Sequence, residues 1–360
     1  MSISEAMSIS FQYLPPVGEA YESDKPILSV IIDCYYKLDL VRQSIQSVLD
    51  QDYPNVELIL VDNGAHLDVR QHLADIHANS KNTALIRFDD NQFAWDDVER
   101  AVAICWNSAL IHAMGEFVCH LSYDDMLSPS YASRMVRLFM ENPDCVTAAP
   151  MPYSINADGE ISSDGYLIDR NRRGRYTDGC SLAFDMITGS PQKLLAAPGE
   201  IFVIKRDLLL KYGGYDRIID LSQVLKYVIL GVSGFDPEAA LYWRHHEGQL
   251  NKQAKKKGAI WYSSSEKAWV DTGIVDLWRQ RFDEVKVKAL LKYKSRMLVA
   301  VPLRVLAENT RQGNAHGVIA ALLNTAKECP TLLPRGIYVV ARELLSMLFG
   351  STYRWLRSRT

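Results

Sequence analysis

Two short apolar runs decide the fold: Leu28-Ser-Val-Ile-Ile32 and Val56-Glu-Leu-Ile-Leu-Val61. Both are rich in β-branched residues, which is typical of strands that are buried on both faces of a sheet. The segment between them carries apolar residues at the spacing of one helix face, namely Val41, Ile45, Val48 and Leu49. The order of strand, helix and strand predicts a parallel βαβ unit with a right-handed crossover.

The same alternation continues along the chain. Residues 84–88 and 117–121 have the composition of buried strands, and residues 98–110 carry one apolar helix face before Gly115. We therefore expect an α/β fold with a doubly wound, mostly parallel sheet over residues 27–150. After residue 150 short strands and helices mix, and from about residue 265 the pattern is helical only. A C-terminal helical extension is predicted there.

Composition excludes several classes of protein. The 360 residues are 48% hydrophobic with a net charge of −3, which argues against wholesale disorder and against a dedicated nucleic-acid binder. Apolar runs such as Met297–Leu303 are far shorter than the roughly 18–20 residues of a membrane span. The first 24 residues lack the pattern of a signal peptide, and the six cysteines are scattered without a C-x-x-C pair. We expect reduced, structural thiols and a cytoplasmic location.

Polar residues follow each predicted strand at the point where it ends. They are Asp33, Tyr35, Asp62, Asp89, Asp90, Asp124 and Asp125. Parallel strands bring their carboxyl ends to one edge of the sheet, where ligands bind. An acidic edge attracts a diphosphate only through a divalent cation, and Mg²⁺ or Mn²⁺ prefers carboxylate oxygens. The chain has neither of the glycine-rich motifs that cradle phosphate in dinucleotide-binding and P-loop proteins.

Several motifs resemble those of family-two glycosyltransferases, which have the GT-A fold. The first half of the resemblance is carried by Ser29-Val-Ile-Ile-Asp-Cys-Tyr-Tyr36, Ile45-Gln-Ser-Val-Leu-Asp-Gln-Asp-Tyr-Pro-Asn-Val-Glu57, Leu60-Val-Asp-Asn-Gly64, Asn107-Ser-Ala-Leu110 and Leu121-Ser-Tyr-Asp-Asp125. The second half is carried by Lys211-Tyr-Gly-Gly-Tyr-Asp216, Asp220 and Tyr242-Trp-Arg-His-His-Glu-Gly-Gln-Leu250. Residues 1–25 are polar with a Pro-Pro turn, which predicts a flexible arm. The resemblance implies a GT-A domain over 26–262. That domain would comprise a nucleotide-binding half (26–150) and an acceptor half (151–262), followed by helices over 263–360.

The resemblance implies three residues that bind the donor nucleotide. Tyr35 matches a tyrosine that stacks on the nucleobase, and an aromatic residue of the rim is the less favoured alternative. Asp62 matches an aspartate that bonds the base or ribose, and a turn aspartate in Asp-Asn-Gly is the alternative. Asn107 matches a position near the donor, and a helix-surface amide is an equal alternative.

The metal ligands are implied by the Asp-x-Asp motif of that family. Asp124 matches its last carboxylate, which binds the cation on the donor diphosphate, and Asp125 is a second candidate ligand. Ser122 replaces the first carboxylate of the motif. The alternative is that Asp124 and Asp125 cap the following helix, which begins at Ser128-Pro129.

The catalytic base that the resemblance implies is Asp220. A carboxylate near the acceptor hydroxyl takes up its proton during an inverting transfer. Ile219 and Ser222 stand where further acids are common, so Asp220 is the local acid that remains, and it could also cap the helix from Leu221. Arg244 and His246 match a segment that closes on the diphosphate or the metal, with His245 competing for the histidine role.

Two basic segments remain outside these motifs. The loops Arg170–Arg175 and Lys252–Lys257 are read either as solvated loops or as contacts to an anionic acceptor. The last thirty residues hold five arginines against Glu343, together with apolar residues at helical spacing. Such a helix lies in a membrane interface, or it packs on the rest of the chain or on a second subunit.

Taken together, the resemblance and its motifs imply an inverting glycosyltransferase that depends on Mn²⁺ or Mg²⁺. The expected donor is a nucleoside-diphosphate sugar, with UDP first, and the expected acceptor is a hydroxyl of a glycan or lipid-linked glycan in bacterial surface polysaccharide synthesis. A peripheral position at the inner face of the membrane is the accompanying expectation. A non-catalytic sugar-nucleotide or glycan binding relative is the alternative, because three acidic positions are replaced. A nucleotidyltransferase is a third alternative, disfavoured by the lack of a basic glycine-rich loop.

Overall fold

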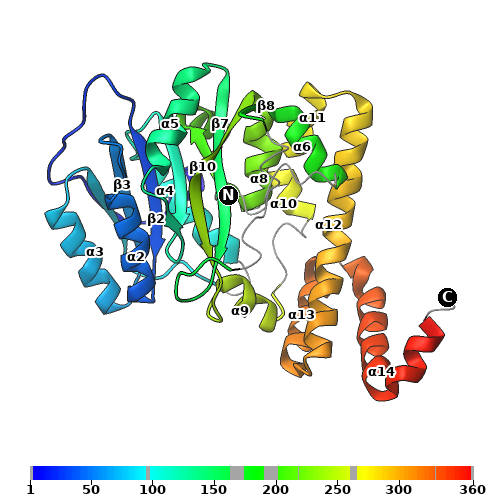
Figure 1. Cartoon of the computed structure of the whole chain (residues 1–360). Coiled ribbons are helices and arrows are strands. Elements are labelled where there is room, and N and C mark those ends of the chain that lie inside the picture. The colour runs from blue at the N-terminus through cyan, green and yellow to red at the C-terminus, as the bar shows by residue number, and fades with distance from the viewer. Residues whose placement is uncertain are drawn as a thin grey trace. The chain divides into compact units, whose positions relative to one another are not determined.

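Figure 1 shows the computed structural model of the chain, which describes residues 3–94, 98–162, 174–189, 202–217, 219–259, 266–328 and 330–357. The chain divides into two compact units, one formed by Met1–Phe93 with Arg100–His245 and one by Ala94–Glu99 with His246–Thr360. The first unit ends directly after the last strand of the sheet, whereas the sequence placed the end of this domain at residue 262.

A ten-stranded sheet forms the centre of the first unit. Its order is β1-β4-β3-β2-β5-β9-β7-β10-β6, and β8 pairs with β10. The bounds of the strands that carry the site are Leu28–Cys34 (β2), Val56–Asn63 (β3), Thr83–Phe88 (β4) and Phe117–Ser122 (β5). These four strands run parallel to one another. The predicted doubly wound, mostly parallel sheet is therefore confirmed.

The other half of the sheet is mixed. Its strands are β6 (Met126–Leu127), β7 (Cys145–Ile155), β8 (Tyr176–Asp178), β9 (Val203–Lys205) and β10 (Val232–Arg244). Strand β9 is antiparallel to both β5 and β7, whereas β7 and β10 are parallel with a register shift between Asp236 and Ala240. The long strand β10 also pairs antiparallel with β6 and β8. Strand β10 thus pairs with three strands of this half of the sheet: β6, β7 and β8.

Amphipathic helices follow the parallel strands. They are α2 (Leu38–Leu49), α3 (Leu67–Asn79), α4 (Val98–Leu110) and α5 (Tyr131–Glu141). Helix α2 buries Val41, Ile45 and Val48, as its spacing predicts. Shorter helices complete the first unit: α1 (Ile3–Ala6), α6 (Gly179–Thr188), α7 (Arg206–Lys211), α8 (Ile219–Ser222), the π-helix η2 (Gln223–Tyr227) and the 3₁₀-helix η3 (Val228–Leu230).

The N-terminal segment, which the sequence presents as a loose arm, contains the strand β1 (Gln12–Leu14). This strand pairs antiparallel with β4. Two buried asparagines hold the chain that follows it: Asn82 Oδ1 accepts from the Ala20 amide at 2.7 Å, and Asn55 Oδ1 accepts from the Glu22 amide at 2.7 Å. These bonds join positions far apart in sequence, so no local pattern predicts them.

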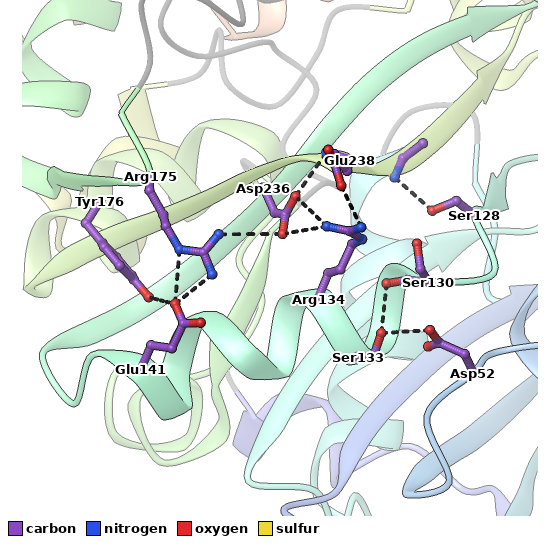
Figure 2. Close-up of polar contacts among 11 residues, drawn as sticks. Asp52, Ser128, Ser130, Ser133, Arg134, Glu141, Arg175, Tyr176, Asp236 and Glu238 are labelled. Carbon is purple, nitrogen blue, oxygen red and sulfur yellow. Dashed lines mark hydrogen bonds and ion pairs between the residues drawn. The ribbon is translucent and has the colours of Figure 1, made fainter.

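Ion pairs connect α5 to β10 and to Arg175, which directly precedes β8, as Figure 2 shows. Arg134 of α5 contacts Asp236 at 3.3 Å and Glu238 at 2.6 Å. Arg175 contacts Glu141, the last residue of α5, at 2.6 Å, and it also lies 3.7 Å from Asp236. Arg175 belongs to the predicted basic loop, and it has a structural role here, while residues 170–173 lie outside the described residues.

The second unit is helical throughout its described part, as predicted. Its helices are α9 (Leu250–Lys256), α10 (Glu266–Asp271), α11 (Ile274–Arg281), α12 (Glu284–Arg311), α13 (Ala315–Glu328), the 3₁₀-helix η5 (Pro330–Leu332) and α14 (Leu333–Arg357). Their core is a cluster of buried side chains from α12, α13 and α14, namely Val305, Leu306, Ala307, Ala321 and Val339. None of the helices, as far as the structure describes them, has a stretch long and apolar enough to cross a membrane.

Candidate active site at the carboxyl ends of the parallel strands

Strand register brings the predicted polar residues to one edge of the sheet. Cys34 of β2 is the partner of Asp62 of β3, and Asp33 of β2 is the partner of Ser122 of β5. Tyr35 directly follows β2, and Asp124 follows β5 by two residues. The ends of three neighbouring strands thus place these groups along one short edge, where an open α/β sheet binds its ligands.

A group of four aromatic rings covers this edge. The rings of Tyr35 and His66 meet edge-on with their centroids 5.0 Å apart, and the ring of Tyr36 lies 5.8 Å from Tyr35 and 5.4 Å from Tyr123. The Tyr35 carbonyl also accepts a hydrogen bond from the His66 amide at 2.9 Å. His66 and Tyr123 were not predicted as site residues, although they follow β3 and β5 by three residues and one residue. The rings supply apolar faces of the kind that stack on a nucleobase.

Asp62 is fully buried and is paired with two arginines. Its Oδ2 lies 3.0 Å from Nε of Arg70 on α3 and 3.2 Å from Nε of Arg87 on β4. Its Oδ1 accepts from the Ala65 amide at 2.8 Å, which closes the turn after β3. Asp62 therefore has the turn role that the sequence left open. The arginines were missed, although Arg87 is the strand partner of Asp62.

Asp33 occupies a different environment at the end of β2. It accepts a hydrogen bond from the indole Nε1 of Trp106 on α4 at 2.9 Å. Burial raises the pKa of the Asp33 carboxyl to about 6, the bond from Trp106 opposes this rise, and the charge of Asp124 adds to it. A carboxyl group of this kind is converted fully to its charged form when a cation binds beside it.

A buried histidine lies under Trp106. The ring of His120 on β5 stacks on the indole with centroids 3.5 Å apart, and the ring of Tyr215 meets His120 edge-on at 5.3 Å. Burial lowers the pKa of His120 to about 3, so its imidazole is neutral at ordinary pH. His120 therefore contributes no positive charge to the edge where Asp33 lies.

Asp124 and Asp125 follow β5 and are both buried. Asp125 Oδ1 accepts a hydrogen bond from the backbone amide of Arg244 at 2.8 Å. Burial raises the pKa of Asp125 well above its ordinary value, and the charge of Asp124 adds to that rise. Lys37, which ends the turn after β2 with a left-handed backbone (φ 62), lies in the field of Asp124. This bond connects Asp125 to the end of β10, and the N-cap residue of the following helix α5 is Ser130.

The side chain of Arg244 does not extend toward a ligand. It is fully buried, and its guanidinium donates to the Asp124 carbonyl (2.8 Å), the Ala157 carbonyl (2.8 Å) and Gln43 Oε1 (2.9 Å). The three bonds join the end of β10 to the loop after β5, to the turn after β7 and to α2. Arg244 therefore positions the loop that carries Asp124, and the expected direct contact with the diphosphate finds no support in this geometry.

Asn107 also has a structural role, because its side chain bonds the backbone of Tyr215. Its amide Nδ2 donates to the Tyr215 carbonyl at 2.8 Å, and its Oδ1 accepts from the Tyr215 amide at 2.8 Å. The residue is completely buried. Both polar ends of the side chain are thus bonded to one backbone residue, which disagrees with a role in contacting the donor and also with the surface amide that was the alternative.

Asp220 lies in the short helix α8, and its side chain lies outside what the structure describes. The helix continues directly into the π-helix η2, a geometry that is found at functional sites more often than elsewhere. Lys226 of η2 forms a buried ion pair with Asp216 at 3.0 Å. This pair anchors the segment that carries Asp220.

His246 is the first residue of its segment of the second unit, and its carbonyl accepts from the Gln249 amide at 3.3 Å. Among the described residues, no group of three or more His, Cys, Asp or Glu side chains could hold a metal ion. Mg²⁺ is commonly held by one or two carboxylates together with substrate phosphates and water. Asp124, with Asp33 near enough for the charge of Asp124 to raise its pKa, fits a site of that smaller kind.

The comparison with known proteins agrees with this geometry. Residues 29–193 match the family model described as Glycosyl transferase family 2. This match confirms the resemblance to family-two glycosyltransferases that was drawn from the motifs.

Curated relatives match over shorter or longer parts of the chain. The putative teichuronic acid biosynthesis glycosyltransferase TuaG of Bacillus subtilis is 28% identical over 146 residues, which cover 41% of this chain and 52% of that protein. The putative glycosyltransferase EpsH of the same organism is 23% identical and is covered over 40% of its length, against 43% of this chain. An uncharacterized glycosyltransferase of Haemophilus influenzae is 26% identical over 66% of this chain and 86% of its own. The match thus spans about half or less of the first two relatives.

Among solved structures, residues 1–349 of S. aureus TarS in complex with UDP have a similar fold. The TM-score is 0.51 at 13% sequence identity, and the match covers 90% of this chain and 92% of that one. The expected GT-A architecture is thereby confirmed.

Proposed function

We propose that this chain transfers a sugar from a nucleoside-diphosphate sugar to a hydroxyl group of a glycan or lipid-linked glycan. The observation that carries the proposal is the strand register, which gathers Asp33, Tyr35, Asp62 and Asp124 at one edge of a family-two glycosyltransferase domain. UDP is the first donor nucleotide to test, because the TarS structure of similar fold was solved with UDP. The domain division at residues 26–150, 151–262 and 263–360 is part of this proposal.

The nucleotide would lie against the aromatic part of the edge. Tyr35 offers a ring face for the base, and stacking of this kind is worth about 1–3 kcal/mol per base. Asp62 is fully buried and already bonded, so it would act at this part of the edge by holding Arg70 and Arg87 in place. This arrangement is supported by the rigidity that two ion pairs give to a buried side chain.

The diphosphate would lie over the acidic part of the edge. Asp124 would hold Mn²⁺ or Mg²⁺, with Asp33 and Asp125 as further candidates. When bound, such a cation offsets the negative charge of the departing nucleoside diphosphate. Arg244 keeps the Asp124 loop in position through its bond to the Asp124 carbonyl.

Asp220 would act as the general base in the transfer. Its carboxylate takes the proton of the acceptor hydroxyl while that oxygen forms a bond to the anomeric carbon. The bond from this carbon to the diphosphate oxygen breaks on the opposite face, so the configuration inverts and the nucleoside diphosphate leaves with the bonding electrons. The ion pair between Asp216 and Lys226 would keep the segment that contains Asp220 in position.

The proposed setting is the synthesis of a bacterial surface polysaccharide at the cytoplasmic side of the membrane. The support is that one relative, TuaG, is named a putative teichuronic acid biosynthesis glycosyltransferase.

Calorimetry with UDP and GDP, each with and without Mn²⁺, tests donor binding. We expect one nucleotide to bind more tightly with Mn²⁺, and failure of both to bind under either condition would overturn the proposal. Donor hydrolysis by the wild type is then compared with Asp220→Asn and with the control Asp144→Asn, which alters an exposed aspartate. A fall of about 10²–10⁴-fold in the first variant alone is the result expected for a general base.

The second candidate function is a non-catalytic sugar-nucleotide or glycan binding module. Ser122, Ile219 and Ser222 favour it, because acids are common at these positions in the family that the chain resembles. If the wild type and Asp220→Asn both bind nucleotide but neither hydrolyses any donor, the chain is a binding module and not an enzyme.

A further inference from the structure

Helix α14 of the second unit carries an exposed apolar stripe. The side chains of Ile337, Tyr338, Leu344 and Leu345 are 56%, 65%, 46% and 43% exposed, and Ala341 between them is exposed as well. These five positions follow the pattern i, i+1, i+4, i+7 and i+8, which is one continuous face of an α-helix. Scattered exposed apolar residues are ordinary, but a continuous face of them marks an interaction surface.

The opposite face of α14 already has its partner inside the same unit. Val339 is buried in the cluster with Leu306 and Ala321, and Val340 packs against this cluster. A Cβ atom at Gly336 would lie 2.9 Å from the Leu306 side chain, so α14 approaches α12 closely there. Figure 1 shows α14 beside α12 and α13. Packing on this helical unit therefore satisfies one face of α14 and leaves the exposed stripe for another partner.

The charge of this part of the chain is strongly positive. Residues 331–360 contain Arg335, Arg342, Arg354, Arg357 and Arg359, with Glu343 as the acid. Glu343 is already paired, with Arg311 at 2.9 Å and with Arg342 at 2.5 Å. An apolar face accompanied by arginines is complementary to a surface that is apolar inside and anionic outside.

We infer that α14 binds the surface of an anionic lipid bilayer, lying in the interface with its Ile337–Leu345 stripe toward the acyl chains. A second copy of the chain is a poorer occupant, because pairing two such helices would bring two arginine-rich segments together. Insertion across the bilayer is not the mode, since no window of α14 within its described residues has the apolarity of a span. The inference does not depend on the proposed transferase activity.

Flotation or sedimentation of the full chain with vesicles tests this surface. One set of vesicles contains phosphatidylcholine alone, and the other contains phosphatidylcholine with about a third phosphatidylglycerol, since juxtamembrane cations respond to anionic lipid. We expect binding to the anionic vesicles that weakens with added salt, and at least about tenfold weaker binding to the neutral ones. Failure to bind the anionic vesicles at low salt would overturn the inference.

The variant Ile337→Gln/Leu344→Gln/Leu345→Gln separates the stripe from the rest of the molecule. Its matched control is Val17→Gln/Val270→Gln/Val285→Gln, which changes three exposed apolar residues elsewhere. We expect at least about a tenfold loss of vesicle affinity in the first variant alone, because each buried apolar side chain contributes more than 1 kcal/mol. Equal affinity of both variants, at equal thermal stability, would contradict a role for the stripe.

The oligomeric state distinguishes the remaining occupant. Sedimentation velocity of the wild type without vesicles should show the same species as the α14 variant. An association that the α14 substitutions dissolve, together with absent vesicle binding, would assign the stripe to a second copy and overturn the lipid proposal.

Discussion

The end of β3 lies beside the ends of β2 and β5 in the sheet, but the carboxylates at these ends have different partners. At the end of β3, Asp62 is held by the guanidinium groups of two arginines. At the ends of β2 and β5, Asp33 and Asp125 accept from neutral donors, an indole and a backbone amide. The first carboxylate is neutralised by the protein itself. In the second group, burial raises the pKa of both carboxyls, and a bound cation would hold them in their charged form. The edge is thus divided into a preformed part and a part completed by ligand.

The largest effect is expected for Asp124→Asn. Removing the proposed cation ligand should lower kcat/KM at least about a thousandfold, because charge stabilisation by a metal is worth several kcal/mol. It should also abolish the dependence of nucleotide affinity on Mn²⁺ measured by calorimetry. Asp158→Asn, at an exposed position, is the control. Retention of the full Mn²⁺ dependence in Asp124→Asn would show that the acidic part of the edge is not where the cation acts.

Asp62→Asn should damage the fold as well as donor binding. It leaves Arg70 and Arg87 without the charge that they share, and we expect a loss of ~2 kcal/mol in the free energy of unfolding, below the range for a completely buried pair. Urea denaturation measures it. Arg87→Gln should cost less, because Arg70 still pairs with Asp62. If neither substitution changes the midpoint of urea denaturation, the ion pairs of Asp62 do not stabilise the fold.

Tyr35 stands between the two parts and should affect the donor alone. Tyr35→Ala is expected to weaken nucleotide binding by about tenfold, since a stacked base is worth about 1–3 kcal/mol, whereas Tyr35→Phe keeps the ring face. Calorimetry with the preferred nucleotide checks this. Equal weakening in both variants would indicate that the hydroxyl group, and not the ring face, makes the contact.

His120 should make stability depend on pH in a defined window. Its pKa is lowered to about 3 by burial, so the unfolded chain takes up the proton first as the pH falls below about 6.5. The stabilisation is therefore complete above pH 6.5 and is lost progressively toward pH 3. Relative to His120→Phe, the wild type should lose ~1 kcal/mol between pH 7 and pH 5.5. If the stabilities of the two proteins changed equally with pH, the imidazole of His120 would be able to take up a proton in the folded protein. Burial would then not keep His120 neutral near Asp33.

The elements of the fold and the location of the site follow from local sequence. The strands β2, β3 and β5, helix α2 and the polar residues that end each strand are visible as runs, periodicities and breaks. The roles of Asn107 and Arg244 are not visible in this way. A motif position states which residue is present, but the partners of these side chains lie at Tyr215 and at Gln43, Asp124 and Ala157, far away in sequence. Packing and hydrogen bonds across the fold decide whether such a side chain faces a ligand or the protein.

The two outermost strands of the described sheet are also among its shortest. Strand β1 has three residues and β6 has two. Short edges offer few open backbone groups to another chain, which is one way in which sheet proteins avoid aggregation. Strand β4 inside β1 reads Thr-Ala-Leu-Ile-Arg-Phe and is almost entirely buried. Trimming the N-terminal segment as a dispensable arm would therefore uncover a longer apolar edge, and solubility would fall before any catalytic residue was touched.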